Sequence, residues 1–359
     1  MLALRHRTPL QIRTKNSSAS RNSNESKILM NKPLQVTGIG HALVDIIAPC
    51  EEALLHEFAL NKGTMRLTSP EEAAALYERM GPAVETSGGS AANTCAGIAS
   101  LGGKVGFMGK VGHDQFARVF AHDIRTIGVV FSDGEAKSET PTGRCLILVT
   151  PDGERTMNTN LGAASEFADA DLDRALIEQS QVLYLEGYLF DPIEARAAFH
   201  TAADIARPAG TKVAFTLSDP FCVDRHRDGF RTFIRDRVDI VFANERELLS
   251  LYPGSSFDEA CATLRTECEI AAITRSEKGA VILHQGGTVS VPAVPIEKLV
   301  DATGAGDLYA AGFLFGLASG RDLEACGRLG SLAASEVIVH VGPRPRRPLV
   351  EAARAHGLL

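Results

Sequence analysis

Residues 301–307 read Asp-Ala-Thr-Gly-Ala-Gly-Asp and lead directly into the apolar run Leu308–Ser319. The run is apolar on every face, which is typical of a buried helix, so its first turn would place unpaired N–H groups inside the protein. The small residues at 304–306 leave room for an anion at these N–H groups, and Asp307 adds a carboxylate at the same point. This combination suits phosphoryl transfer, in which the N–H groups hold the phosphoryl group and the carboxylate accepts the proton of the attacking hydroxyl. Taken alone, the segment is equally consistent with a tight turn and an acidic helix start.

A second group of residues could bind a polyhydroxylated substrate. Asp45 follows the strand-like segment Leu34–Gly40, at the edge where a doubly wound sheet presents its ligand contacts. Further on, residues 87–93 read Ser-Gly-Gly-Ser-Ala-Ala-Asn. Gly88 and Gly89 would let the backbone approach a substrate, and the amide of Asn93 offers both a donor and an acceptor to hydroxyl groups. A surface or helix-capping role for Asp45 is the alternative.

Two common nucleotide-binding patterns are missing from the sequence. It contains no G-x-x-x-x-G-K-[ST] segment, which excludes a P-loop kinase. Gly38-Ile39-Gly40 follows a strand, but position 43 is leucine, so the dinucleotide-binding fingerprint is incomplete.

The segment 301–307 resembles the second signature of the ribokinase-like (PfkB) carbohydrate kinase family, with Ala302 where threonine is usual. Residues 87–93 resemble the first signature of that family, and the resemblance extends over about residues 34–345. It implies that Asp307 is the catalytic base and that the backbone of Ala305, Gly306 and Asp307 forms the anion hole. It also implies that Asp45, Gly88, Gly89 and Asn93 bind the acceptor.

The same resemblance implies where ATP and metal ions bind. Asn244-Glu245-Arg246-Glu247 is similar to the N-x-x-E segment that the family associates with magnesium and phosphate, and Glu247 is expected to act through water because Mg²⁺ keeps several of its waters. Asp301 would lie at a monovalent-cation site, which in many members binds potassium. The expected ATP contacts are Asn244, Thr274, Gly279, Thr303, Gly304 and Gly306.

The elements that must position these residues alternate between strands and helices from Leu34 onwards. Alternation of this kind predicts an α/β fold, a doubly wound and mostly parallel sheet with helices on both faces, and the resemblance implies the ribokinase-like version of it. The expected elements are strands at 34–40, 104–109, 181–185, 212–217, 239–243 and 270–274, with helices at 91–101, 115–127, 193–206, 227–235 and 260–266. Ser69-Pro70-Glu71-Glu72 predicts a helix start with a capping box.

One segment breaks this rhythm. Arg144–Thr150 and Glu154–Thr159 flank the turn Pro151-Asp152-Gly153, which predicts a hairpin. We expect a separate small sheet, built from about 46–68, 83–90 and 141–162, that acts as a lid over the substrate within a kinase domain of 34–345. An antiparallel extension of the main sheet is the alternative, and residues 346–359 are expected to form a C-terminal helix or tail.

Three stretches resemble the adenosine kinase branch of the family, which implies that the acceptor is adenosine. Residues 160–164, Asn-Leu-Gly-Ala-Ala, resemble the N-L-x-A-A of that branch, and residues 217–221, Leu-Ser-Asp-Pro-Phe, resemble its L-S-x-P-F. Asn160 and Tyr188 are therefore expected at the nucleoside, with Tyr188 able to stack on a purine. Arg144 does not fit this pattern and would instead suit an acidic sugar. The alternatives are a kinase of ribose, fructose or 2-keto-3-deoxygluconate and, in another class, a non-catalytic ligand-binding protein.

The charge distribution separates the start of the chain from the rest. Residues 1–32 contain seven Lys/Arg and one Glu, which gives them a net charge of +6. The whole chain has a net charge of −7, so the remaining residues carry a net charge of −13. An acidic body argues against nucleic acid as a partner. No apolar run reaches membrane-spanning length, and the seven cysteines form no C-x-x-C pair, so we expect a cytoplasmic monomer or homodimer with reduced thiols. Residues 1–33 are expected to be a disordered basic extension, either a transit peptide or an overlong start preceding Met30.

Overall fold

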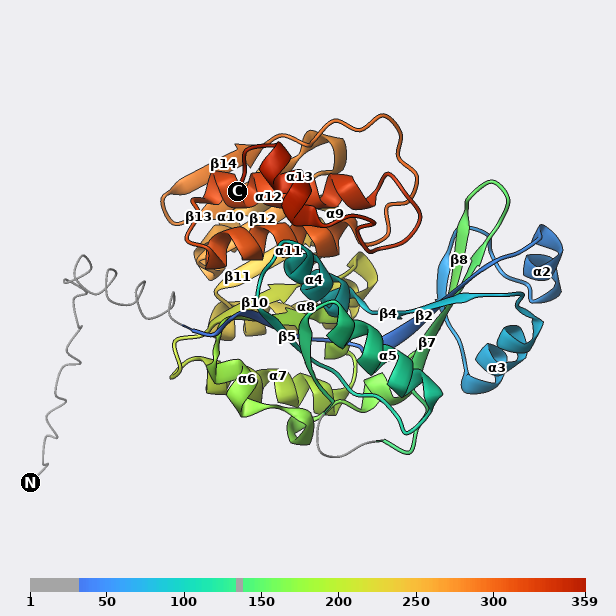
Figure 1. The fold of residues 1–359 in the computed structure, drawn as a ribbon. Helices are drawn as coiled ribbons and strands as arrows, with labels where there is room; N and C mark the ends of the chain where they lie inside the picture. Colours follow the sequence, from blue (N-terminus) through green and yellow to red (C-terminus); the bar gives the residue numbers. More distant parts are fainter. Residues whose placement is uncertain (1–31, 134–137) are drawn as a thin grey trace, which may run out of the picture.

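The computed structural model describes residues 32–133 and 138–359, so most of the predicted basic extension lies outside the described residues. It contains a large α/β body and, projecting from one edge of it, a small second sheet (Figure 1).

The large sheet has nine strands in the order β14-β13-β12-β11-β10-β9-β1-β5-β6. Every neighbouring pair from β6 to β12 is parallel, and β13 and β14 are antiparallel additions at one edge that the sequence did not predict. The strands are β1 (Leu34–Ile39), β5 (Val105–Met108), β6 (Val129–Ser132), β9 (Ser180–Glu186), β10 (Lys212–Thr216), β11 (Ile240–Asn244), β12 (Ile270–Thr274), β13 (Ala280–His284) and β14 (Gly287–Val291).

Each face of this sheet has its own apolar core, because alternate residues of a strand point to opposite faces. Val182 and Tyr184 of β9 pack into one core, while Leu183 and Leu185 pack into the other. The first core is covered by α4 (Ser90–Ser100), α5 (Gln115–Thr126), α11 (Ala305–Ala318), α12 (Leu323–Val337) and α13 (Leu349–Ala355). The second is covered by α6 (Arg174–Glu178), α7 (Ile193–Ala206), α8 (Pro220–Arg237), α9 (Glu245–Leu251) and α10 (Phe257–Glu267). The predicted doubly wound fold is confirmed.

The small sheet has the order β3-β8-β7-β2-β4, and the predicted hairpin is its antiparallel β7–β8 pair. The alternative, an extension of the main sheet, is wrong. The strands of the small sheet are β2 (Leu43–Pro49), β3 (Met65–Leu67), β4 (Val84–Gly88), β7 (Gly143–Val149) and β8 (Arg155–Asn160). Strand β2 was not predicted from the sequence. Asp45 therefore was expected in the turn after β1, but it lies within this strand of the small sheet.

Local sequence signals explain several element boundaries. The capping box at Ser69 and Glu72 is present at the start of α3 (Pro70–Arg79). Helix α8 begins seven residues before the predicted start at Arg227, because Asp219 caps Pro220–Arg237 and accepts a hydrogen bond from the Cys222 N–H. Its backbone is non-helical at His226, which marks a kink.

Two further expectations concern the chain as a whole. All seven cysteines are free thiols, as predicted. Within residues 32–133 and 138–359, no helix combines the length and the apolar character needed to span a membrane.

Candidate active site

A cavity of about 610 Å³ lies between the large sheet and the small sheet. It opens at the carboxyl ends of β1, β9, β10 and β11, which contribute His41, Glu186, Asp219 and Asn244 to its lining. Strand β1 lies between β5 and β9, where the chain reverses its direction of progress across the sheet. Open α/β sheets bind ligands at such a switch point.

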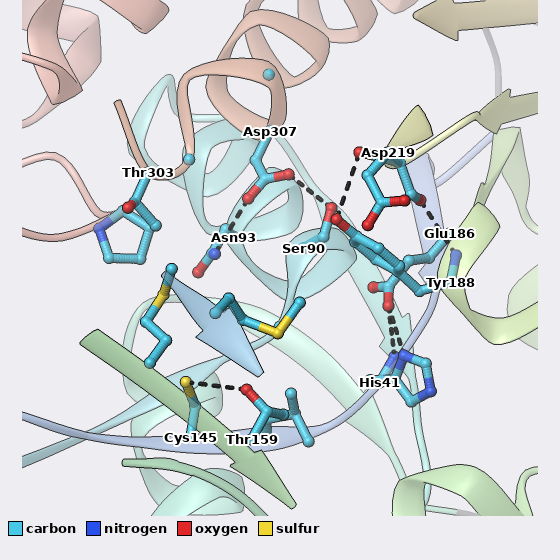
Figure 2. Close-up of a pocket in the computed structure, with 18 of the residues that line it drawn as sticks. His41, Ser90, Asn93, Cys145, Thr159, Glu186, Tyr188, Asp219, Thr303 and Asp307 are labelled. Carbon is cyan, nitrogen blue, oxygen red and sulfur yellow. Dashed lines mark hydrogen bonds and ion pairs between the residues drawn. The ribbon is translucent and has the colours of Figure 1, made fainter. Parts of the chain in front are cut away.

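Asp307 lies in the first turn of α11 and is half-buried at the polar end of this cavity (Figure 2). Its carboxylate accepts hydrogen bonds from Ser90 Oγ, at 2.6 Å, and from Asn93 Nδ2, at 3.1 Å. Burial raises the pKa of Asp307 to about 7, although the two hydrogen bonds favour the charged form. A carboxylate with a pKa near neutrality is suited to take a proton from a hydroxyl.

The backbone before Asp307 provides free N–H groups at the start of α11. Gly304 adopts a left-handed conformation with φ of +80° as the residue that precedes the helix. Within the part of the chain that the structure describes, no acceptor pairs with the N–H groups of Gly306 and Asp307. The Ala305 N–H instead donates to the Ala302 carbonyl at 3.2 Å, so two of the three N–H groups expected to bind an anion are free and that of Ala305 is not.

Asp45 reaches the same cavity from β2. It is buried, and desolvation raises the pKa of its carboxyl to about 6. Gly88 lies opposite on β4, where a Cβ would come within 2.4 Å of the Asp45 carboxylate, so this glycine makes room for Asp45 and does not itself line the cavity. Gly89 does line it, with φ of +98°, and a Cβ there would meet the His41 carbonyl at 2.1 Å.

Asn93 also lines the cavity, but its amide is engaged by protein groups. Its Nδ2 donates to Asp307, and its Oδ1 accepts from Nε of Arg344 at 2.9 Å. No role was predicted for Ser90 or Arg344 from the sequence. Ser90 stands inside the segment 87–93 and could have been recognised there, whereas nothing local connects Arg344 with Asn93.

Asn244 and Glu247 form the capping box of α9 at the far side of the cavity. Glu247 accepts a hydrogen bond from the Asn244 N–H at 2.9 Å, and burial raises the pKa of its carboxyl to about 7. Asp219 adds a nearby negative charge. A buried carboxylate beside a second one favours a bound cation.

Of the remaining expected ATP contacts, Thr303 lines the cavity, whereas Thr274 and Gly279 are not among the residues that line it. Thr274 pairs with Asn244 across β12 and β11, so it lies at the same sheet edge. Gly279 has φ of +83°, and a Cβ there would collide with the Val291 carbonyl at 2.1 Å.

Asp301 was expected at a monovalent-cation site, but its carboxylate faces a guanidinium. Nη1 of Arg155 donates to Asp301 Oδ2 at 2.7 Å, and the N–H groups of Thr303 and Gly342 also donate to Asp301, each at 2.9 Å. These donors do not leave a coordination shell for potassium, so the expectation for Asp301 is corrected. No role was predicted for Arg155 from the sequence. It lies at the start of β8, and its Nε and Nη2 are buried without a hydrogen-bond partner.

Two expected acceptor contacts lie on the wrong face of the small sheet. Arg144 and Asn160 are directly paired across β7 and β8, as are their neighbours Cys145 and Thr159. Because successive residues alternate between faces, only Cys145 and Thr159 line the cavity. Arg144 packs over the ring of Phe116 at 5.2 Å, and Asn160 donates to the Thr68 carbonyl at 3.1 Å. Both expectations are corrected.

The wall of the cavity opposite Asp307 is mainly apolar. It consists of Leu43, Met65, Leu67, Cys145, Ile147, Met157, Thr159 and Leu161 from the small sheet. Tyr188 from the 3₁₀ turn Gly187–Phe190 and Phe221 from α8 face it across the cavity. Figure 2 shows Cys145 and Thr159 on one side and Asp307, Asn93 and Tyr188 on the other. The site thus joins an acid–base and anion-binding end to an apolar end.

Comparison with known proteins agrees with this geometry. Residues 64–348 match the pfkB family of carbohydrate kinases. The crystal structure of adenosine kinase from Sinorhizobium meliloti is 51% identical, with a TM-score of 0.82, and the match covers 89% of this chain and 98% of that one. A probable sugar kinase from Rhizobium etli is 48% identical, with a TM-score of 0.84 and coverage of 91% and 100%. The adenosine kinase of Saccharomyces cerevisiae is 28% identical over 338 residues, which cover 88% of this chain and 97% of that protein. The chain therefore belongs to the pfkB family of carbohydrate kinases and is a kinase that uses ATP.

Proposed function

We propose that this kinase phosphorylates the primary 5′-hydroxyl of a purine nucleoside, with adenosine as the preferred acceptor. The observation that carries the proposal is the apolar wall of the small sheet, which faces Tyr188 and Phe221 across the cavity. A free sugar offers hydroxyls on every side and gains little from such a wall, whereas a purine ring can bury both of its faces there.

The polar end of the cavity matches the ribose of such a substrate. Within the described residues, the Asp45 carboxylate accepts no hydrogen bond from a protein group, so it is free to accept two from ribose hydroxyls. This arrangement would orient the 5′-hydroxyl towards Asp307.

Asp307 would then remove the proton of the 5′-hydroxyl as its oxygen attacks the γ-phosphorus of ATP and ADP leaves. The N–H groups of Gly306 and Asp307 would hold the charge that develops on the transferring group. Arg155 would add positive charge from the lid side, since two of its buried nitrogens have no partner in the described structure. The nucleotide would extend over Thr303 and Gly304 towards Asn244, Thr274 and Gly279.

Magnesium fits the residues around Glu247. The site offers one buried carboxylate with a raised pKa and a second at Asp219, which suits an ion that keeps most of its waters. Mg²⁺ would be held there through water and would neutralise phosphate charge. Potassium does not fit at Asp301, where Arg155 supplies the positive charge, and no step is assigned to it.

A sugar kinase is the second candidate, because the Rhizobium etli relative is described as a probable sugar kinase. The residues around Asp307 and Asp45 would serve a sugar equally well. The form of this candidate that takes an acidic sugar loses its main support, since Arg144 faces away from the cavity.

The test is release of ADP with adenosine, inosine, ribose, fructose and 2-keto-3-deoxygluconate, with Asp307→Asn as the inactive control. We expect the highest kcat/KM with adenosine, and loss of about 10²–10⁴ in kcat in Asp307→Asn with an unchanged melting temperature. A sugar that exceeded adenosine tenfold in kcat/KM would overturn the choice of acceptor. A folded Asp307→Asn that retained more than about a tenth of kcat would overturn the assignment of the base.

A further inference from the structure

The segment Gly342–Arg344, between α12 and α13, touches three parts of the site in succession. The Gly342 N–H donates to Asp301. Pro343 packs against Gly304, where a Cβ would lie 2.7 Å from the Pro343 Cβ. Arg344 reaches furthest and contacts the N-terminal side of α4. We call Gly342–Arg344 the C-terminal strap.

Arg344 is partly buried, and its guanidinium bridges two residues around the start of α4. Its Nε donates to Asn93 Oδ1 at 2.9 Å, and its Nη2 donates to the carbonyl and hydroxyl oxygens of Ser87 at 2.7 and 3.1 Å. A guanidinium is a donor only, so Asn93 must turn its oxygen towards Arg344. The Asn93 Nδ2 is then directed at Asp307, 3.1 Å away. The opposite amide orientation would place an oxygen against the carboxylate, without a donor.

We propose that Arg344 is a positioning residue for phosphoryl transfer, which fixes the Asn93 amide so that it donates to Asp307 and keeps that base ionised. The proposal rests on the assignment of Asp307 as the base. It explains why the strap crosses the site without contributing a side chain other than Pro343 to the cavity lining.

The charges around Arg344 come from several elements. Asp45 on β2, Asp123 on α5 and Asp307 on α11 all interact with the guanidinium, and Cys95 of α4 lies beside it. Asp123 accepts hydrogen bonds from the Ser87 N–H and hydroxyl, which completes a chain from α5 through Ser87, Arg344 and Asn93 to the base. Glu186 on β9 opposes this effect, because its charge raises the pKa of Asp307 while that of Arg344 lowers it.

The first measurement is the pH dependence of kcat at saturating ATP, magnesium and acceptor for the wild type, Arg344→Met and Arg347→Met. Removing a cation near a carboxylate raises the pKa of that carboxyl, so we expect the rising limb in Arg344→Met to move up by about one pH unit. At neutral pH, kcat should fall about 10- to 100-fold, with part of the loss recovered in alkali. Arg347 lies three residues further on and forms an ion pair with Glu336, away from the cavity, so Arg347→Met is the matched control and should behave as the wild type.

A folded Arg344→Met with an unmoved limb would overturn the proposal. If Arg344→Met does not fold, Arg344→Lys is the variant that tests the proposal, because lysine keeps the positive charge but lacks the planar guanidinium fork. Should Arg344 act through Asn93, the kcat losses of Arg344→Lys and Asn93→Ala will not add in the double variant. Additive losses would assign Arg344 a separate structural role. An active Asp307→Asn would instead show that the base is wrongly assigned, so the two failures are distinguishable.

Discussion

At the scale of single residues, the proposed base is a half-buried carboxyl, that of Asp307. Burial alone would hold Asp307 protonated, while Ser90, Asn93 and Arg344 each favour the charged form. The balance leaves its pKa at about 7, near the pH at which a general base is most effective. Asp45 shows the same competition, between burial on one side and Arg344 and Arg155 on the other.

This balance predicts a pH dependence for the wild-type enzyme. Below a pH of about 7 the Asp307 carboxyl is protonated and cannot accept the proton of the acceptor, so kcat should fall about tenfold per pH unit and level off above that point. The measurement is kcat at saturating acceptor and MgATP, because a bound cation keeps Glu247, at the far side of the cavity, ionised and removes its titration from the profile. A kcat that stayed constant from about pH 5.5 to 8 would contradict Asp307 as the titrating base.

At the scale of elements, the catalytic turn is held by close packing of helices with small residues. Helix α11 packs against α12 and α4, and almost every residue from Leu308 to Gly316 is buried. Gly312 lies at the closest point, where a Cβ would come within 2.3 Å of the Leu329 carbonyl and 2.7 Å of the Gly330 nitrogen. Backbone atoms cannot move aside as a flexible side chain would.

Gly312→Ala should therefore separate α11 from α12 and destabilise the fold. We expect the free energy of unfolding to fall by about 1–3 kcal/mol or more, although alanine has the higher helix propensity. Denaturant unfolding measures this, and Gly81→Ala is the control, because a Cβ at Gly81 meets no atom within 4 Å. Equal stability of the two variants would show that the α11–α12 contact adapts readily.

At the scale of the whole molecule, the two sheets face each other across a cavity whose lid wall is open to solvent. Met65 is 47% exposed and Leu67 is 60% exposed, and neighbouring exposed apolar side chains in a cavity wall are typical of a ligand-binding groove. Phe221, on the opposite side, is 73% exposed. The Arg155–Asp301 ion pair connects the small sheet to the turn that precedes α11.

We predict that adenosine draws the small sheet onto the large one and buries this wall. The backbone amides of β3 and β8 should then exchange hydrogen more slowly, as local opening of the lid becomes rarer. Hydrogen exchange with and without adenosine measures this effect, and strands β13 and β14, at the far edge of the large sheet, serve as the internal control. Unchanged exchange in β3 and β8 at saturating adenosine would contradict closure of the lid.

Much of the fold could be predicted from the amino-acid sequence, because the relevant signals are local. The alternation of strands and helices specified the doubly wound sheet, the break at 151–153 specified the hairpin, and the turn 304–307 placed an acid at a helix start. Each of these follows from the conformational preferences of a few consecutive residues.

Which side chains meet in the cavity could not be predicted in this way, because it depends on how distant segments pack. Arg144 and Asn160 were expected at the acceptor, but the pairing of β7 with β8 directs Cys145 and Thr159 there, and a shift of one residue reverses every side chain of a strand. Arg155 contacts Asp301, which lies 146 residues further along the chain. Arg344 contacts Asn93, which lies 251 residues earlier. Contacts across such separations depend on how the sheets and helices pack, and no local pattern encodes them.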